Sequence, residues 1–215
     1  MALVKAQVTQ EVVDYLARHA GSDPVLERVA AETAAMPRAE MATPPDEAAL
    51  LTMLARLIGA RRALEVGTFT GYGAISIARG LADDGRLTCL ELEEHYAAIA
   101  RRNLEAAGVA SRVEILVGPA LESLRAMPAA PTFDYVLLDA DKTGYPDYYE
   151  ELVPRLLPGG LLLIDNVLLR GGVTNPQDDR ERVIDALNDR ITADERVESV
   201  MVLVADGLTF VRRRR

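Results

Sequence analysis

Residues 63–92 read ALEVGTFTGYGAISIARGLADDGRLTCLEL, and this stretch decides the fold. A short apolar run at 63–66 leads through a glycine-rich loop into a helical pattern at 72–79. An Asp-Gly turn then precedes a second apolar run at 87–92. A strand, a helix and a second strand in this order predict a βαβ unit, in which the two strands are parallel.

The same alternation continues toward the C-terminus. Apolar strands are predicted at 113–117, 135–138 and 161–164, with helices at 94–107, 120–126 and 148–157 between them and a helix at 178–191 beyond. Residues 197–204 and 208–212 flank an Asp-Gly turn and are typical of a terminal hairpin. Strands that alternate with helices favour an α/β fold, a parallel sheet with helices on both faces.

The first sixty residues are helical in pattern and lack strands. Prolines interrupt the pattern at 36–45, because a proline disfavours helical conformation in the residue before it. A further helix is predicted at 46–58. We expect a single domain over 1–215, with a helical N-terminal extension at 1–60 and an α/β core at 61–215.

Composition excludes several classes of protein. The 215 residues are 49% apolar and carry a formal net charge of −9, so a nucleic-acid surface is not expected. The one cysteine, Cys89, excludes a disulfide framework and a thiolate zinc site, and its apolar neighbours predict a buried side chain. Neither a secretory leader nor a run of membrane-spanning length is apparent, so we expect a cytoplasmic protein without membrane contact.

The glycine-rich loop is the first candidate binding site, because ligands of open α/β sheets bind beyond the carboxyl ends of the strands. Its glycines at 67, 71 and 73 depart from the G-x-G-x-x-G spacing of dinucleotide sites. Glu65, just before the loop, is unfavourable for a pyrophosphate but suits the ammonium and sulfonium charges of S-adenosylmethionine. Glu91, 24 residues after Gly67, ends the next strand and can accept the hydroxyls of a ribose.

A second group of polar residues follows two later strands. Asp139 comes directly after 135–138, and Asp165 and Asn166 come directly after 161–164. Since the carboxyl ends of parallel strands share one edge of the sheet, these three side chains should converge there. Two carboxylates and an amide are hard oxygen ligands, which fit Mg²⁺ first and also Mn²⁺ or Ca²⁺.

Lys142 lies three residues beyond Asp139, close enough to reach a group held by such a cation. A divalent cation nearby disfavours the ammonium form and makes this lysine a candidate general base. Tyr145, Tyr148 and Tyr149 follow, as candidates to flank an aromatic acceptor or to pack the next helix.

From about residue 36 to 213 the chain resembles the cation-dependent class I O-methyltransferases of the caffeoyl-CoA and catechol type. The resemblance rests on MATPPDEAALL, LEVGTFTGYG, GPALESL, LLDADKTGYPDYY, PGGLLLIDNVLLRGGV, ALND and DGLTF, in the order of the family. It implies a Rossmann-like fold with a seven-stranded, mostly parallel sheet whose last strand is antiparallel. It also implies a homodimer built with the help of the apolar N-terminal helices.

The resemblance further implies roles for particular residues. The metal ligands would be Asp139, Asp165 and Asn166, with Lys142 as the base. The contacts to S-adenosylmethionine would be Thr43, Glu65, Gly67, Thr68, Gly73, Glu91, Ala120 and Asp141.

Three positions depart from the pattern of the family. Gly73 stands where many relatives have a serine, so only its backbone can contribute, and Glu91 replaces an aspartate while keeping the carboxylate. Leu169-Arg170 stands where the plant caffeoyl-CoA enzymes have Trp-Asn, which argues against a coenzyme-A ester as substrate.

The expected function is therefore transfer of a methyl group from S-adenosylmethionine to one hydroxyl of a small vicinal dihydroxy aromatic compound, with a divalent cation. Two alternatives stay open: a nicotinamide-dependent oxidoreductase and a non-catalytic S-adenosylmethionine-binding protein. An RNA methyltransferase is disfavoured by the acidic balance and the lack of a basic stripe.

Overall fold

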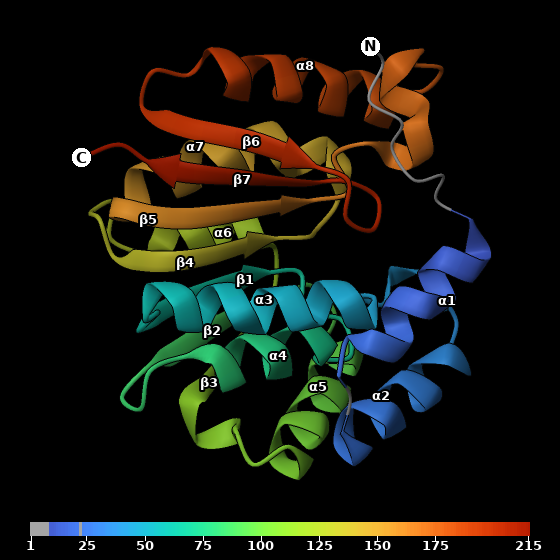
Figure 1. Cartoon of the computed structure of the whole chain (residues 1–215). Coiled ribbons are helices and arrows are strands. Elements are labelled where there is room, and N and C mark those ends of the chain that lie inside the picture. Colours follow the sequence, from blue (N-terminus) through green and yellow to red (C-terminus); the bar gives the residue numbers. More distant parts are fainter. Residues whose placement is uncertain (1–8, 22) are drawn as a thin grey trace.

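Seven strands form one sheet in the computed structural model, which describes residues 9–21 and 23–215 (Figure 1). Their bounds are β1 Arg62–Val66, β2 Arg86–Glu91, β3 Val113–Val117, β4 Phe133–Leu138, β5 Leu156–Asp165, β6 Val197–Val202 and β7 Leu208–Arg213. The order across the sheet is β3-β2-β1-β4-β5-β7-β6. Strands β1 to β5 are parallel, whereas β7 is antiparallel to both β5 and β6. The expected fold, with its antiparallel last strand, is confirmed.

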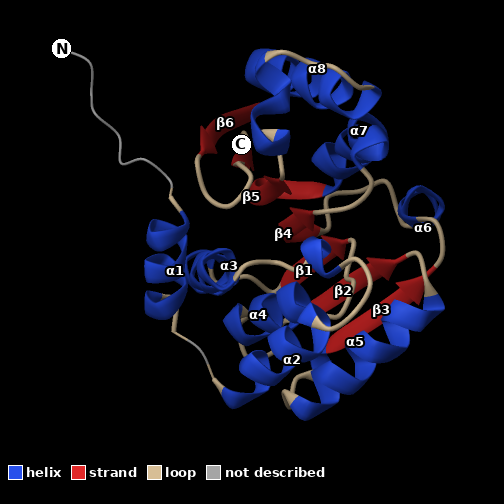
Figure 2. Cartoon of the chain, turned by 90° about the vertical axis from the view of Figure 1, so that its right-hand side faces the viewer, coloured by secondary structure: helices blue, strands red, loops and turns tan. Residues whose placement is uncertain are grey.

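Helices cover both faces of this sheet. The α-helices are α1 Gln10–His19, α2 Pro24–Ala34, α3 Pro45–Ile58, α4 Tyr72–Gly80, α5 Glu94–Ala106, α6 Ala120–Ala126, α7 Tyr145–Arg155 and α8 Asp179–Ala193. Short 3₁₀ turns are η1 Ala39–Met41, η2 Ala110–Arg112, η3 Lys142–Gly144 and η4 Leu169–Thr174. Helices α3, α4 and α5 lie on one face and α6, α7 and α8 on the other, with α1 and α2 outside the first layer (Figure 2). Among the described residues, no helix is both long and apolar enough to cross a membrane.

Alternation along the central strands supplies a separate core to each face. Tyr135 and Leu137 of β4 pack in the cluster that contains α3 and α4, whereas Val136 and Leu138 pack in the cluster that contains α7 and α8. Successive residues of a strand point to opposite faces, so this division follows from sequence position alone. Cys89 is fully buried in the first cluster, as its apolar neighbours predicted.

The boundary between α7 and β5 differs from the prediction. Helix α7 covers Tyr145–Arg155 and β5 starts at Leu156, whereas the sequence suggested a helix at 148–157 and a strand at 161–164. The helix ends at Arg155 because Leu156 takes an extended conformation, although its N–H still donates to the Leu152 carbonyl. Leu156 then pairs with Phe133 of β4, so β5 starts before its Pro-Gly-Gly segment.

Helix α3 is fixed against the sheet and against α4. The Tyr135 hydroxyl donates to the Leu51 carbonyl at 3.1 Å, and the Thr52 hydroxyl donates to the Ser76 carbonyl at 2.8 Å. Gly80 permits the close approach of the two helices, since a Cβ there would lie 2.6 Å from the Thr52 carbonyl oxygen. These contacts hold α3 in a defined position over the sheet.

Candidate active site

The carboxyl ends of β1 and β4 define a crevice at the centre of the sheet. These strands are neighbours although β2 and β3 lie on one side and β5 on the other, so the strand order reverses between them. Ligands of open α/β sheets bind at such a switch point. Val66 pairs with Leu138, and Leu138 with Ile164, which brings the residues that follow each strand to one level.

Gly67 makes the close packing of this crevice possible. Its φ of +91° is accessible to glycine, and a Cβ at this position would lie 1.9 Å from the Asp139 carbonyl oxygen. The backbone of the glycine loop therefore passes directly against the start of the loop after β4. Any side chain at this position would push the two loops apart.

Glu65 lies inside the crevice with almost no access to solvent. Its side chain is buried, and Oε2 has no hydrogen-bond partner among the described residues. Burial raises the pKa of Glu65 to about 8, against a smaller opposing effect of the Thr68 hydroxyl. A buried carboxylate without a partner is an unsatisfied group that a cationic ligand would complete.

Thr43 and Gly73 lie beside this carboxyl group. A Cβ on Gly73 would be 2.6 Å from Oε1 of Glu65 and 3.5 Å from Oγ1 of Thr43. The structure thus brings together three of the residues that the sequence assigned to S-adenosylmethionine. A serine at 73 would collide with the carboxylate as it stands, so glycine fits this arrangement. A cavity of about 350 Å³ adjoins Thr43 and is lined also by Tyr72 and Thr33.

Glu91 has a second role that the sequence did not suggest. Its Oε2 accepts the backbone N–H groups of Phe69 at 2.7 Å and Thr68 at 3.2 Å, and its Oε1 accepts that of Glu93 at 3.0 Å. The carboxylate therefore holds the glycine loop in shape. Because a carboxylate offers about four acceptor positions, three amides leave room for a ribose hydroxyl.

Ala120 and Asp141 lie at the same edge of the sheet. Ala120 begins α6 after β3, and the adjoining loop is tied to β2 by the Gly118 N–H, which donates to the Glu91 carbonyl at 2.9 Å. The Asp141 carboxylate accepts the Gly144 N–H at 3.0 Å and the Tyr148 hydroxyl at 2.7 Å. Its oxygens are thus engaged by its own loop and by α7.

Lys142 and Asp139 form the centre of the second half of the site. Lys142 Nζ donates to Asp139 Oδ1 at 2.9 Å and to the Tyr145 hydroxyl at 2.6 Å. The Tyr145 hydroxyl in turn donates to the Asp165 carbonyl at 3.1 Å. Tyr145 is buried and joins the ends of β4 and β5, so its role is in packing rather than beside an acceptor. Tyr148 and Tyr149 are also buried in the α7 core.

Asp165 is the most enclosed of the predicted metal ligands. Its side chain is 3% exposed, and burial together with the Asp139 charge raises the pKa of this carboxyl. The Asn166 N–H donates to Asp165 Oδ1 at 2.6 Å, and Asn166 itself has a φ of +56°. That backbone conformation is one that asparagine tolerates better than most residues.

These residues fit a hard divalent cation. Two carboxylates and an amide follow adjacent strands, and burial disfavours the carboxylates unless a positive charge accompanies them. Within the part of the chain that is described, no three His, Cys, Asp or Glu side chains form a ready-made metal cluster. The Asn166 amide and water would have to complete the ligand set, as is usual for Mg²⁺.

Glu47, a residue that sequence reasoning missed, adds a third carboxyl group here. It lies in the first turn of α3, is 1% exposed and is close enough to Asp165 and Asp139 for their charges to act on it. Burial, and then the charges of Asp165 and Asp139, raise the pKa of Glu47. A glutamate in the first turn of a helix is ordinary, so nothing in the pattern itself marked this one.

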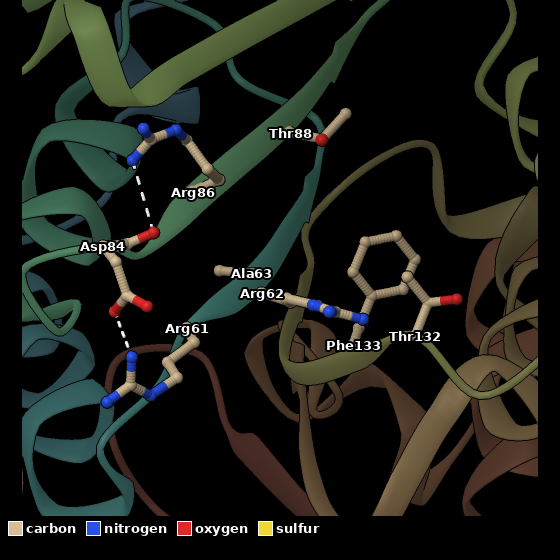
Figure 3. A pocket seen from close by; sticks show the side chains of 8 residues that line it. All are labelled: Arg61, Arg62, Ala63, Asp84, Arg86, Thr88, Thr132 and Phe133. Carbon is tan, nitrogen blue, oxygen red and sulfur yellow. Dashed lines mark hydrogen bonds and ion pairs between the residues drawn. The ribbon is translucent and has the colours of Figure 1, made fainter.

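Another cavity lies elsewhere, at the amino ends of the strands. It encloses about 450 Å³ between the starts of β1, β2 and β4 and is lined by Arg61, Arg62, Ala63, Asp84, Arg86, Thr88, Thr132 and Phe133 (Figure 3). The Asp84 carboxylate pairs with Arg61, and the Asp134 carboxylate accepts the N–H groups of Arg61 and Arg62. This cavity lies at the opposite edge of the sheet from the crevice, and arginine side chains line it, so it is a separate feature.

The fold and the crevice together define an S-adenosylmethionine-dependent methyltransferase. The model of a family described as O-methyltransferase matches residues 17–214, and the chain belongs to this family. The chain is 39% identical to the catechol O-methyltransferase of Mycobacterium tuberculosis over 163 residues, 76% of this chain and 74% of that protein. It is 37% identical to the caffeoyl-CoA O-methyltransferase of Petroselinum crispum over 194 residues, 84% of this chain and 80% of that protein.

Solved structures agree with this assignment. The O-methyltransferase of Bacillus cereus in complex with S-adenosylhomocysteine superposes with a TM-score of 0.87 at 33% identity, covering 95% of this chain and 97% of that one. The resemblance inferred from the sequence motifs is thereby confirmed. The chain is an S-adenosylmethionine-dependent O-methyltransferase, which decides against the oxidoreductase and the non-catalytic binding protein.

Proposed function

We propose that this enzyme methylates one hydroxyl of a small vicinal dihydroxy aromatic compound and that it needs a divalent cation, Mg²⁺ in first place. The observation that carries the proposal is the grouping of Asp139, Asp165 and Asn166 beside Lys142 and next to the glycine loop. Two adjacent oxygens on one ring can chelate a single cation, which a monophenol cannot do. The relative named for catechol supports the same class of acceptor.

The donor half of the site has the chemistry that S-adenosylmethionine requires. The Glu65 carboxylate would pair with a cationic part of the donor, with Thr43 and the Gly73 backbone beside it. Glu91 would receive the ribose while it holds Thr68 and the rest of the loop in place. Gly67, Ala120 and Asp141 would border the remaining parts of the donor.

The acceptor half of the site consists of Asp139, Lys142, Asp165 and Asn166, and its task is to remove a proton from the acceptor hydroxyl. A phenol ionises near pH 10, and a divalent cation supplies a Lewis acid that lowers this pKa. Close to a bound cation the neutral form of Lys142 would be favoured, its Nζ would take the hydroxyl proton, and the oxygen would then attack the methyl carbon of the donor. The new O–CH₃ bond forms as the S–CH₃ bond breaks, leaving S-adenosylhomocysteine. Asp139 orients Lys142 through the 2.9 Å contact.

We also propose a homodimer in which the N-terminal helices of residues 1–60 help to close the site. Val13 and Leu16 of α1 and Met53 and Leu57 of α3 are exposed apolar side chains on neighbouring helices. Exposed apolar side chains that cluster on one surface are typical of association sites. Light scattering at micromolar concentration should give twice the mass of one chain, and a monomer would contradict the proposal.

An acceptor panel tests the proposed substrate class. The enzyme is incubated with S-adenosylmethionine carrying a labelled methyl group, Mg²⁺ and either a catechol or the matching monophenol. We expect transfer to the catechol and at least about a hundredfold slower transfer to the monophenol, because chelation lowers the barrier only for the former. Equal rates would contradict a chelated acceptor, although the methyltransferase class would stand.

A further inference from the structure

Glu47 occupies a helix position where its usual local partner does not exist. It is the third residue of α3, and a glutamate there ordinarily accepts the backbone N–H of the N-cap residue. The N-cap of α3 is Pro44 and the first helical residue is Pro45, and proline has no N–H. Helix capping therefore does not account for a carboxyl group at this place.

The burial of Glu47 is unusual for a side chain without a cationic partner. The residue is 1% exposed, and Oε2 has no hydrogen-bond partner among the described residues. Asp165 and Asp139 are near enough for their negative charges to act on Glu47, an arrangement that ionised carboxyl groups disfavour. A buried carboxyl oxygen that has no partner and lies near like charges is stabilised by a positively charged ligand.

The charges of this cluster match a divalent cation. Glu47, Asp139 and Asp165 supply three carboxylates, and Lys142 supplies one ammonium, which leaves an excess of two negative charges. Like charges at this range repel one another, and a cation with two positive charges would offset that repulsion.

The three carboxyl groups do not themselves close around one point. Mg²⁺ commonly binds through one or two carboxylates and keeps several water molecules, which need acceptors of their own. We propose that Glu47 is a positioning residue of the cation site, whose carboxylate accepts hydrogen bonds from the water shell of a divalent cation held by Asp139, Asp165 and Asn166. This inference rests on the cation site of the proposed function.

The position of Glu47 would couple the cation to the donor half of the site. Glu47 is in the first turn of α3, and Thr43 lies just before that helix, beside Gly73 and Glu65. Further along, α3 is tied to β4 by the Tyr135 hydroxyl and the Leu51 carbonyl. Cation binding should therefore order the segment 43–50 and fix Thr43 in place.

The experiment measures the affinity for Mn²⁺ alone, by electron paramagnetic resonance of the free ion, in the wild type, Glu47→Gln and Asp46→Asn. Asp46→Asn removes the same charge one residue away at a more exposed position, and so it is the matched control. We expect Glu47→Gln to weaken binding about 10- to 100-fold, the usual effect of losing an outer partner of a metal ligand. Asp46→Asn should change the affinity by no more than about twofold, because a half-buried charge that water reaches is screened more than the buried Glu47.

Two further readouts separate positioning from a purely structural role. Hydrogen exchange of residues 43–50 should slow on addition of Mn²⁺ in the wild type and change much less in Glu47→Gln. Without metal, Glu47→Gln should be at least as resistant to heat as the wild type, because it removes a carboxylate from a repulsive cluster. A structural role would instead lower the melting temperature with and without metal.

Each outcome decides between the two proposals. Equal Mn²⁺ affinity in the wild type and Glu47→Gln would overturn the role of Glu47 and leave the cation site intact. No binding by the wild type would overturn the cation site and this inference together. If Glu47→Gln does not fold, Glu47→Asp takes its place, since a carboxylate that is one methylene shorter should also bind Mn²⁺ more weakly, and an unchanged affinity would overturn the role.

Discussion

Lys142 Nζ lies 2.9 Å from Oδ1 of Asp139, so the proposed base and one proposed metal ligand form an ion pair in the free protein. Both side chains are largely buried, and Nζ makes a second hydrogen bond to the Tyr145 hydroxyl. This pair holds Lys142 at the carboxyl end of β4 before any ligand arrives. Because of this ion pair, a substitution at either residue disturbs both the charge balance of the site and the position of Lys142.

Asp139→Ala should be more damaging than Asn166→Ala. The first change removes an anionic ligand and the partner of Lys142, and we expect kcat to fall on the order of 10³-fold, since several kcal/mol of charge stabilisation are lost. The second removes a neutral amide that water can replace. Steady-state kinetics check the ranking, and calorimetry should find S-adenosylmethionine binding largely retained in both variants. A larger loss in Asn166→Ala would be incompatible with the proposed ligand roles.

Lys142→Arg separates the charge of this residue from its function as a base. Arginine keeps a positive charge beside Asp139 but does not lose its proton in proteins. We expect kcat to fall about 10²- to 10⁴-fold, the usual contribution of general acid–base catalysis, with Mn²⁺ affinity little changed. Retention of most of the activity would show that Lys142 serves only as a charge.

Glu65→Gln should make the ligand-free protein less sensitive to pH. Burial raises the pKa of Glu65 from its ordinary value of 4.5 to about 8, so its stabilising contribution is complete below 4.5 and is lost as pH rises through 8. The free energy of unfolding of the variant, relative to the wild type, should rise with pH across this window by up to about 1.4 kcal/mol per unit. Urea unfolding at several pH values measures this difference. If the free energies of unfolding of the wild type and the variant changed with pH in parallel, the raised pKa of Glu65 would be contradicted.

Glu91→Ala should affect donor binding more than cation binding. It removes acceptors for the ribose and for the N–H groups of Thr68 and Phe69, each such hydrogen bond to a charged group being worth about 1.5–3 kcal/mol. We expect the Kd for S-adenosylmethionine to rise at least about tenfold. Calorimetry with S-adenosylmethionine and with Mn²⁺ separates the two halves of the site. An unchanged Kd for the donor would remove Glu91 from the ribose site.

The fold and most of the crevice could be predicted because they depend on the order of strands, loops and helices along the chain. Strand ends and loop residues are adjacent in sequence, so Glu65, Gly67 and Asp139 could be assigned to one edge once the sheet was known to be parallel. The end of α7 was predicted less well, because the pairing of Leu156 with Phe133 of β4 fixes it.

Glu47 and the second role of Glu91 depend on contacts that no local pattern encodes. Glu47 comes near Asp165 only because α3 packs over the sheet, next to the end of β5. Glu91 binds the amides of a loop that precedes it by more than twenty residues. Contacts between residues so far apart in sequence follow from tertiary packing, so neither could be predicted from the sequence alone.

The most direct measurement of the central claim is methyl transfer to a catechol in the presence of EDTA. If Asp139, Asp165 and Asn166 hold a divalent cation that activates the acceptor, EDTA should abolish transfer, and added Mg²⁺ or Mn²⁺ should restore it. S-adenosylmethionine binding, measured in parallel by calorimetry, should survive EDTA because the donor half lies on Glu65 and Glu91. Full activity in EDTA would contradict the cation-dependent mechanism.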